Sequence, residues 1–156
     1  MINMAQEIKI YVDGDACPVK EEIVRVAQRH QLVVILVSNQ WMRLPSIPKV
    51  QGIVVEGGLD KADDWIAERV GSRDIAITAD IPLAARCLEQ GAKVIGPGGK
   101  PFDEDSIGMG LAMRDLNAHL RDTGEISGYN PSFGKKDRSR FLNTLENTIQ
   151  ALKRQG

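Results

Sequence analysis

Residues 8–18, IKIYVDGDACP, contain a short apolar run that ends in an acidic turn and is followed by a proline. The run is typical of a buried β-strand, and Pro18 is typical of the first turn of a helix. Further apolar runs alternate with helix-like stretches downstream, at 32–37, 51–55, 74–78 and 92–95. Five short strands separated by helices of about ten residues indicate a parallel sheet that is covered on both faces.

The helix-like stretches are recognised by apolar stripes and by residues that begin or end helices. They are expected at about 18–30, 60–70, 82–91, 105–121 and 136–154. Asp60 is expected to cap the second of them, and either Asp105 or Ser106 the fourth. The last stretch carries an apolar stripe that is expected to dock on the sheet. The predicted fold is therefore α/β, a three-layer α/β/α sandwich with a mostly parallel five-stranded sheet, in one domain over 1–156.

Length and composition support a single globular domain. The chain has 156 residues, of which 42% are hydrophobic and 26% are charged. No apolar run is long enough to span a bilayer, and the N-terminus lacks a signal pattern, so a cytoplasmic location and no membrane partner are expected. Cys17 and Cys87 are expected to be free thiols. Residues 1–110 carry a net charge of −4 and residues 111–156 one of +3, a small excess that hints at a phosphate-bearing partner.

The positions of the aspartates are the most informative feature of the sequence. Asp13 and Asp15 follow the first predicted strand, and Asp80 follows the strand at 74–78. Asp63 lies in the first turn of the helix before that strand, at the margin of its apolar stripe, whereas Asp64 is expected to face solvent. Because the carboxyl ends of parallel strands meet at one edge of a sheet, these side chains are expected to converge.

Converging carboxylates either raise their pKa values or recruit a cation. Hard oxygen ligands with room for water suit Mg²⁺ or Mn²⁺. Such a metal lowers the pKa of a bound water and shields a phosphodiester oxygen, which permits phosphate hydrolysis. The alternative interpretation is that each aspartate only caps a helix or forms a turn.

Five motifs together resemble the bacterial YaiI/YqxD family. They are VDGDACPVK at 12–20, VSN at 37–39, ADDWIA at 62–67, ITADIPLA at 77–84 and KDRSRF at 136–141. The resemblance covers nearly the whole chain, and the family is named for uncharacterised proteins. The family in turn is similar to PIN-like and NYN-type nuclease domains, which implies a PIN-like fold and metal-dependent cleavage of RNA.

The resemblance also implies roles for individual residues. Asp13, Asp63 and Asp80 correspond to the acidic residues that bind Mg²⁺ or Mn²⁺ in such nucleases, and Thr78 to a hydroxyl residue beside them. Asp15 fits a second carboxylate of the NYN-like variant, so the expected catalytic set is Asp13, Asp15, Asp63 and Asp80. A fourth acidic position in the middle of the chain has only Glu56 as a candidate.

Basic and polar side chains are expected to hold the substrate. A basic segment lies at 135–140, and basic residues there oppose the helix dipole, which favours a role in binding phosphate. The candidates for contact with an RNA backbone or its phosphates are Lys20, Ser38, Asn39, Thr78, Lys136, Arg138 and Arg140, with Arg114 as a further basic candidate.

Two other functions fit the same residues. One is a catalytically inactive module that binds nucleic acid. The other is a phosphatase similar to haloacid dehalogenases, in which Asp13 is the nucleophile and Asp15 the general acid. The phosphatase pattern is incomplete, because Ala16 follows the second aspartate where such enzymes have Thr or Val.

Overall fold

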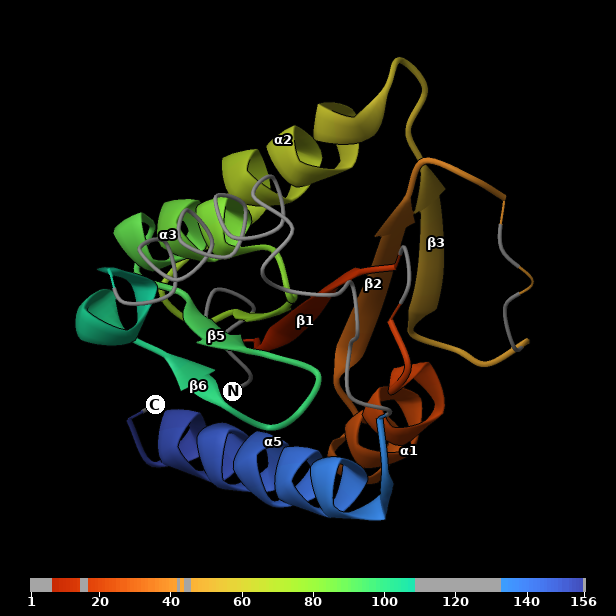
Figure 1. Cartoon of the computed structure of the whole chain (residues 1–156). Helices are drawn as coiled ribbons and strands as arrows, with labels where there is room; N and C mark the ends of the chain where they lie inside the picture. Colours follow the sequence, from red (N-terminus) through yellow and green to blue (C-terminus); the bar gives the residue numbers. More distant parts are fainter. Residues whose placement is uncertain (1–6, 15–16, 42, 44–45, 109–132, 156) are drawn as a thin grey trace.

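The computed structural model describes residues 7–14, 17–41, 43, 46–108 and 133–155 (Figure 1). Strands and helices alternate along the first hundred residues except at 33–38 and 50–54, where two strands follow each other, and a long helix spans 135–155. The elements are β1 (Lys9–Asp13), α1 (Lys20–His30), β2 (Val33–Ser38), β3 (Val50–Val54), α2 (Leu59–Arg69), β4 (Ile75–Ile77), α3 (Ile81–Glu89), β5 (Lys93–Ile95), β6 (Pro101–Phe102) and α5 (Lys135–Gln155).

The strands form one six-stranded sheet in the order β3-β2-β1-β4-β5-β6. All neighbouring pairs are parallel except β5 and β6, which are antiparallel. β1 is central: Val12 pairs with Leu36 of β2 on one side and with Ile77 of β4 on the other. The predicted parallel sheet is thus confirmed, and the short antiparallel strand β6 adds a sixth member that the sequence did not predict.

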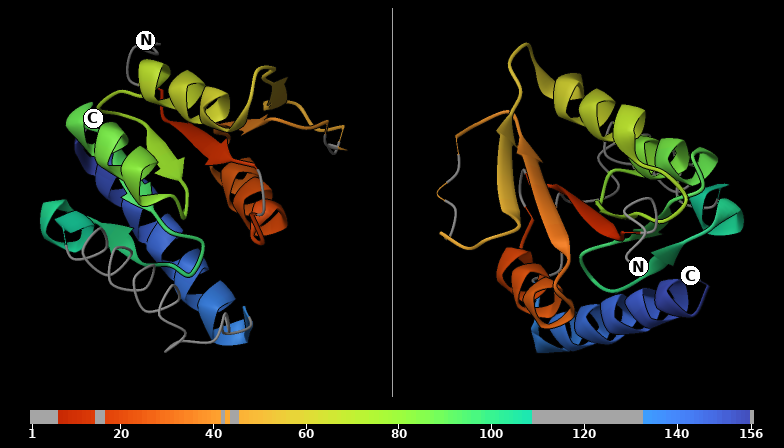
Figure 2. Two further views of the ribbon diagram at one scale, coloured as in Figure 1. Left: turned by 45° about the horizontal axis from the view of Figure 1, so that its top comes forward. Right: turned by 180° about the vertical axis from the view of Figure 1, so that it is seen from behind.

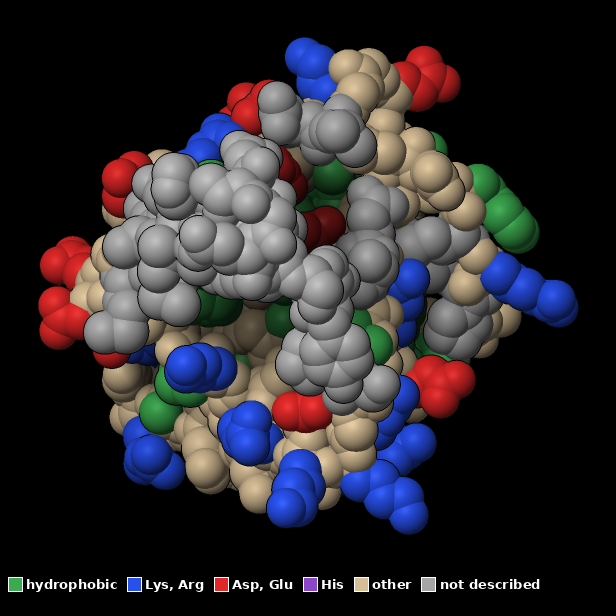
Figure 3. Space-filling model, viewed as in Figure 1, with side chains coloured by type: hydrophobic (Ala, Val, Ile, Leu, Met, Phe, Trp, Pro, Cys, Tyr) green, Lys and Arg blue, Asp and Glu red, His purple; other side chains and the backbone are tan. Residues whose placement is uncertain are grey.

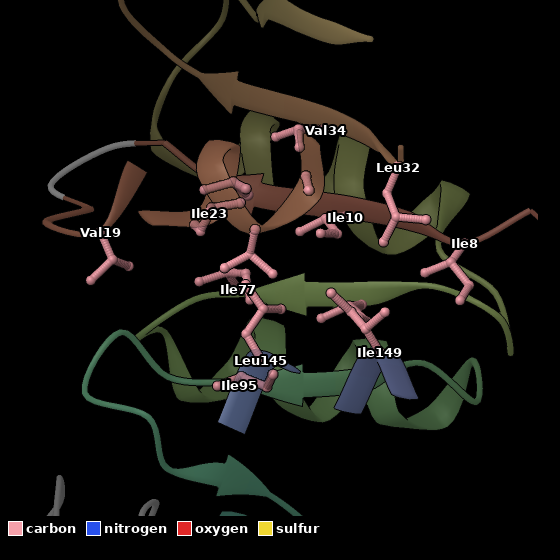
Figure 4. Close-up of a cluster of buried hydrophobic side chains, with 14 of the residues drawn as sticks. Ile8, Ile10, Val19, Ile23, Leu32, Val34, Ile77, Ile95, Leu145 and Ile149 are labelled. Carbon is pink, nitrogen blue, oxygen red and sulfur yellow. The ribbon is translucent and has the colours of Figure 1, made fainter. Parts of the chain in front are cut away.

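Helices cover both faces of the sheet, as Figures 1 and 2 show. Side chains alternate in direction along a strand, so successive residues of β1 enter different cores. Ile10 and Val12 pack with residues of α1 and α5, whereas Tyr11 packs with residues of α2 and α3. Figure 4 shows the first of these cores, in which residues of β1, β2, β4 and β5 meet α1 and α5. This confirms the three-layer α/β/α arrangement.

The long helix α5 docks on the sheet as its apolar stripe predicts. Phe141, Leu145, Ile149 and Leu152 are each fully buried. Truncating a buried Phe to Ala typically costs about 3–5 kcal/mol, so α5 is an integral layer of the fold. The opposite face of α5 is polar, and in the described part of the chain no helix is long and apolar enough to cross a bilayer.

Polar contacts fasten α5 to the last turn of α1. The carboxylate of Glu146 accepts hydrogen bonds from Arg29 and from Nε2 of His30, and Nδ1 of His30 lies 2.8 Å from Nζ of Lys153. Hydrogen bonds from His30, then Gln150, then Arg29 lower the pKa of Glu146 to about 2, so this carboxylate is ionised at neutral pH. The side chain of His30 is only 8% exposed in this contact between the two helices.

Several predicted element boundaries differ from the structure. α1 begins at Lys20, two residues after Pro18. α2 begins at Leu59 with Gly58 at its N-cap, so Asp60 does not occupy the N-cap position. Asp103 and Ser106 hydrogen-bond each other reciprocally at the start of a helical segment over 104–108, so neither Asp105 nor Ser106 is its cap. The rest of the helix expected over 105–121 lies outside the described residues.

Candidate functional site at the carboxyl edge of the sheet

Three neighbouring strands bring polar residues to one edge of the sheet. Asp13 is the last residue of β1, and Ser38 is the last residue of β2. Thr78 follows β4 directly, and because Val12 pairs with Ile77, it lies beside Asp13. Adjacent strands are about 4.8 Å apart, so Thr78 and Ser38 flank the end of β1 from both sides. The carboxyl ends of these three strands therefore lie side by side.

A chain of hydrogen bonds connects Asp13 with Asp80. Thr78 donates from Oγ1 to Oδ2 of Asp13 at 3.0 Å, and the same Oγ1 accepts from the backbone N–H of Asp80 at 3.0 Å. Oδ1 of Asp80 accepts from the backbone N–H of Leu83, also at 3.0 Å, and thereby caps α3. Thr78 is only 2% exposed. Asp13 and Asp80 are therefore held in place by buried or backbone groups.

Asp80 caps α3, in agreement with the alternative interpretation of the aspartates, but this cap occupies only part of the acceptor capacity of its carboxylate. An ionised carboxylate offers about four acceptor sites, and the bond from Leu83 takes one of them. Pro82, in the first turn of the same helix, has no N–H to satisfy. Asp80 can thus cap α3 and still present acceptor capacity at the sheet edge.

Asp63 and Asp64 lie against α3, near Arg86. Oδ1 of Asp64 accepts from Nη1 of Arg86 at 2.8 Å; the Asp64 side chain is 42% exposed, so it faces solvent as expected and is also paired with Arg86. Asp63 is half-buried, and its negative charge contributes to the raised pKa values of Arg86 and Cys87. The larger causes of those shifts are the hydrogen bond that Arg86 donates to Asp64, for Arg86, and burial, for Cys87. Asp63 therefore lies close to Arg86 and Cys87 of α3.

Within the ranges that the structure describes, no three His, Cys, Asp or Glu side chains are close enough together to hold a metal ion. Asp13, Asp63 and Asp80 hence do not form such a group by themselves. Asp15, which the sequence analysis placed in the site, lies outside the described residues. Glu56, the candidate for a further acidic position, is exposed just after β3.

Ser38, the hydroxyl candidate, is the last residue of β2, and Asn39, the amide candidate, comes directly after it. Ser38 is 1% exposed, and its Oγ accepts from the backbone N–H of Gln40 at 3.1 Å. Asn39 follows it and is half-buried. Ser38 thus shapes the turn after β2.

The basic residues at the start of α5 differ in their contacts, because Arg138 and Arg140 pair with carboxylates whereas Lys136 is exposed. Arg138 donates to Oε1 of Glu22 at 2.6 Å and to the carbonyl of Pro18 at 3.1 Å, so it ties α5 to the start of α1. Arg140 lies 3.6 Å from Asp137. Lys136 is exposed and Lys20 is half-buried near the same end of α1. Figure 3 shows Lys and Arg side chains gathered over the face that α5 forms.

Glu22 is a residue of this region that the sequence analysis did not single out. It is only 9% exposed, although it belongs to the acidic first turn of α1. The sequence spacing does indicate that Glu22 is buried. Glu22 stands three residues after Val19 and four before Val26, which places it on the buried stripe of the helix.

Fold and site together define an α/β protein whose central strand ends in a carboxylate that is hydrogen-bonded to its neighbouring strand. A family model described as the uncharacterised YaiI/YqxD family (DUF188) matches residues 11–151, and the chain belongs to this family. The predicted family resemblance is confirmed. No solved structure matches the chain significantly.

Several similar curated proteins carry the family designation UPF0178. The chain is 60% identical over 146 residues to a UPF0178 protein of Parvibaculum lavamentivorans, covering 94% of this chain and 96% of the relative. A UPF0178 protein of Agrobacterium fabrum is 54% identical over 151 residues, covering 97% and 99% of the two chains. One from Rhodospirillum rubrum is 55% identical over 148 residues, covering 94% and 99%.

Proposed function

We propose that this chain is a Mg²⁺- or Mn²⁺-dependent phosphodiesterase that cleaves RNA. The observation that supports it best is the hydrogen-bonded set of Asp13, Thr78 and Asp80 at the carboxyl edge of the sheet. In open α/β sheets this edge is where ligands bind. The choice of RNA rests on the similarity of the family to PIN-like and NYN-type nucleases.

Asp13 and Asp80 are the residues that would hold the metal. Asp15, two residues after Asp13 in the sequence, would supply a third carboxylate. Mg²⁺ is commonly held by one or two carboxylates, with water and substrate phosphate as its other ligands, so the described donor set fits. A bound ion would supply positive charge to the phosphodiester and acidify an attacking water. Asp63, whose neighbours include α3, would contribute negative charge without direct ligation.

Thr78 acts as a positioning residue in this proposal. Its hydroxyl hydrogen is donated to Asp13, and its oxygen is fixed by the N–H of Asp80. Second-shell hydrogen bonds of this kind orient the carboxylates that bind a metal. Thr78 therefore sets the direction of the Asp13 carboxylate, and Asp80 is fixed by the first turn of α3.

The exposed lysine at the start of α5 is the proposed contact for the RNA backbone. Lys136 is free to reach outward, whereas Arg138 serves mainly to join α5 to α1 through Glu22. Lys20, a further basic candidate, is the first residue of α1. Phosphate contacts of this kind give sequence-independent affinity that falls as salt rises.

The proposal predicts that the purified full chain cleaves a single-stranded RNA oligonucleotide when Mn²⁺ or Mg²⁺ is added. EDTA is expected to stop the reaction, and excess Mn²⁺ to restore it, with products followed by denaturing gel electrophoresis. A small phosphomonoester, assayed in parallel, is expected to remain intact.

Two outcomes of this assay would contradict the proposal. Salt-sensitive RNA binding without any metal-dependent product would indicate the inactive binding module. Hydrolysis of the phosphomonoester with an aspartyl-phosphate trapped at Asp13 would indicate the phosphatase.

A further inference from the structure

A pocket of about 720 Å³ opens between the start of α1, the end of β2 and the segment after β2. This volume lies within the usual range for small-molecule sites, about 300–1,000 Å³, and is far larger than a phosphate ion needs. Val24, Leu36 and Ile47 supply apolar surface. The charged lining residues are Lys20, Arg25, Arg43 and Arg138 together with Glu21 and Glu22, so cations outnumber anions by two.

Glu22 gives the pocket an unsatisfied acceptor. Its Oε1 is paired with Arg138, but its Oε2 is buried and has no hydrogen-bond donor among the residues that the structure describes. A buried polar atom left without a partner typically costs about 1–3 kcal/mol. A ligand that brings an N–H group to this oxygen would relieve that cost, whereas a purely anionic ligand would be repelled by it.

The pocket adjoins the carboxylate site. Leu36, which lines it, pairs with Val12, the residue before Asp13. Cys17, another lining residue, has a pKa raised mainly by burial and further by the charges of Asp13 and Glu22. The pocket therefore lies near the end of β1 that carries Asp13.

We infer that this pocket binds one nucleotide unit of the substrate. The base packs on Val24, Leu36 and Ile47 and donates an N–H to Oε2 of Glu22. The phosphate contacts the basic side chains of the rim, of which Arg25 and Arg43 are exposed. A nucleotide combines the three required chemistries: a flat apolar ring, N–H donors on its edge and a phosphate. The choice of ligand rests on the proposed function.

The test is isothermal titration of the full chain with GMP, AMP, CMP and UMP in EDTA, with ribose 5-phosphate as the base-free comparison. At least one nucleotide is expected to bind at a single site, at least tenfold more tightly than ribose 5-phosphate. Glu22→Gln is expected to weaken that nucleotide about tenfold, as for the loss of one charge-assisted hydrogen bond.

Glu21→Gln is the matched control, because it removes the same charge from the neighbouring residue, which is exposed and lines the same pocket. It is expected to change the affinity less than threefold. Should Glu22→Gln fail to fold, Arg25→Gln on the exposed rim is expected to weaken binding about fivefold, with Arg154→Gln at the end of α5 as its control.

Any of three results would overturn the inference. They are no saturable binding of a nucleotide, an affinity for ribose 5-phosphate equal to that for the nucleotides, or the same loss of affinity in each variant as in its control. The titration needs neither metal nor catalysis, so Asp13→Asn is expected to bind the nucleotide like the wild type. Binding without RNA cleavage would refute only the proposed function, and cleavage without binding would refute only the pocket.

Discussion

Asp13→Asn is expected to lower metal-stimulated RNA cleavage by at least about 100-fold, the effect typical of losing one preorganised polar group from an active site. The substitution removes the negative charge but keeps the size of the side chain. Its amide oxygen can still accept the hydrogen bond that Thr78 now donates at 3.0 Å. The thermal unfolding midpoint is therefore expected to stay close to that of the wild type, and cleavage is measured as initial rates at saturating Mn²⁺.

Asp64→Asn is the control for this variant. It removes an identical charge from α2, where Asp64 pairs with Arg86 on the surface of the molecule. Surface ion pairs contribute little to stability, about 0–1 kcal/mol, so this variant is expected to keep both its fold and its cleavage rate. Equal activity of Asp13→Asn and Asp64→Asn would remove Asp13 from the catalytic machinery.

Gly99→Ala is expected to lower the free energy of unfolding by about 2–6 kcal/mol. Gly99 has φ +90°, and a Cβ added there would lie 2.5 Å from backbone atoms of Arg140 and Phe141 in α5. The backbone conformation costs a non-glycine residue about 1–3 kcal/mol, and overpacking adds about 1–3 kcal/mol. The turn also accepts a hydrogen bond from Thr144 at the carbonyl of Gly99, which any displacement of the turn would weaken.

Gly98→Ala tests the same turn without the clash. A Cβ at Gly98 would have as its nearest neighbour an oxygen of the Asp137 side chain, 3.9 Å away, and its φ is not in the positive range. The change in unfolding free energy, measured by urea denaturation, is expected to stay within about 0.5 kcal/mol. A similar loss in both variants would show that the turn at 96–100 does not pack closely on α5.

The sequence predicted the sheet because its signals are local. The β-branched run at 32–37 and the apolar runs around it are typical of strands, and the stripe that includes Phe141 and Leu145 is typical of a docked helix. The ends of the strands that carry Asp13 and Thr78 were expected at one edge, because parallel strands align their carboxyl ends, and Thr78 itself was placed beside the acidic residues by the family resemblance. These inferences need periodicity and topology but no side-chain geometry.

Features that depend on tertiary contacts could not be predicted in the same way. The strand β6 has two residues and exists because Phe102 pairs with Val94. His30 is buried by Glu146 and Lys153, more than a hundred residues away in sequence. The position of Asp63 depends on how α2 packs against α3, since a rotation of one residue moves a side chain by about 100°.

The central claim is that Asp13 and Asp80 together hold a divalent cation at the carboxyl edge of the sheet. The most direct measurement is anomalous X-ray diffraction from crystals of the full chain soaked in Mn²⁺. The account predicts a manganese peak in contact with the carboxylates of Asp13 and Asp80, and loss of that peak in Asp13→Asn crystals. Well-ordered Asp13 and Asp80 side chains with no peak beside them, or manganese bound only elsewhere, would contradict it.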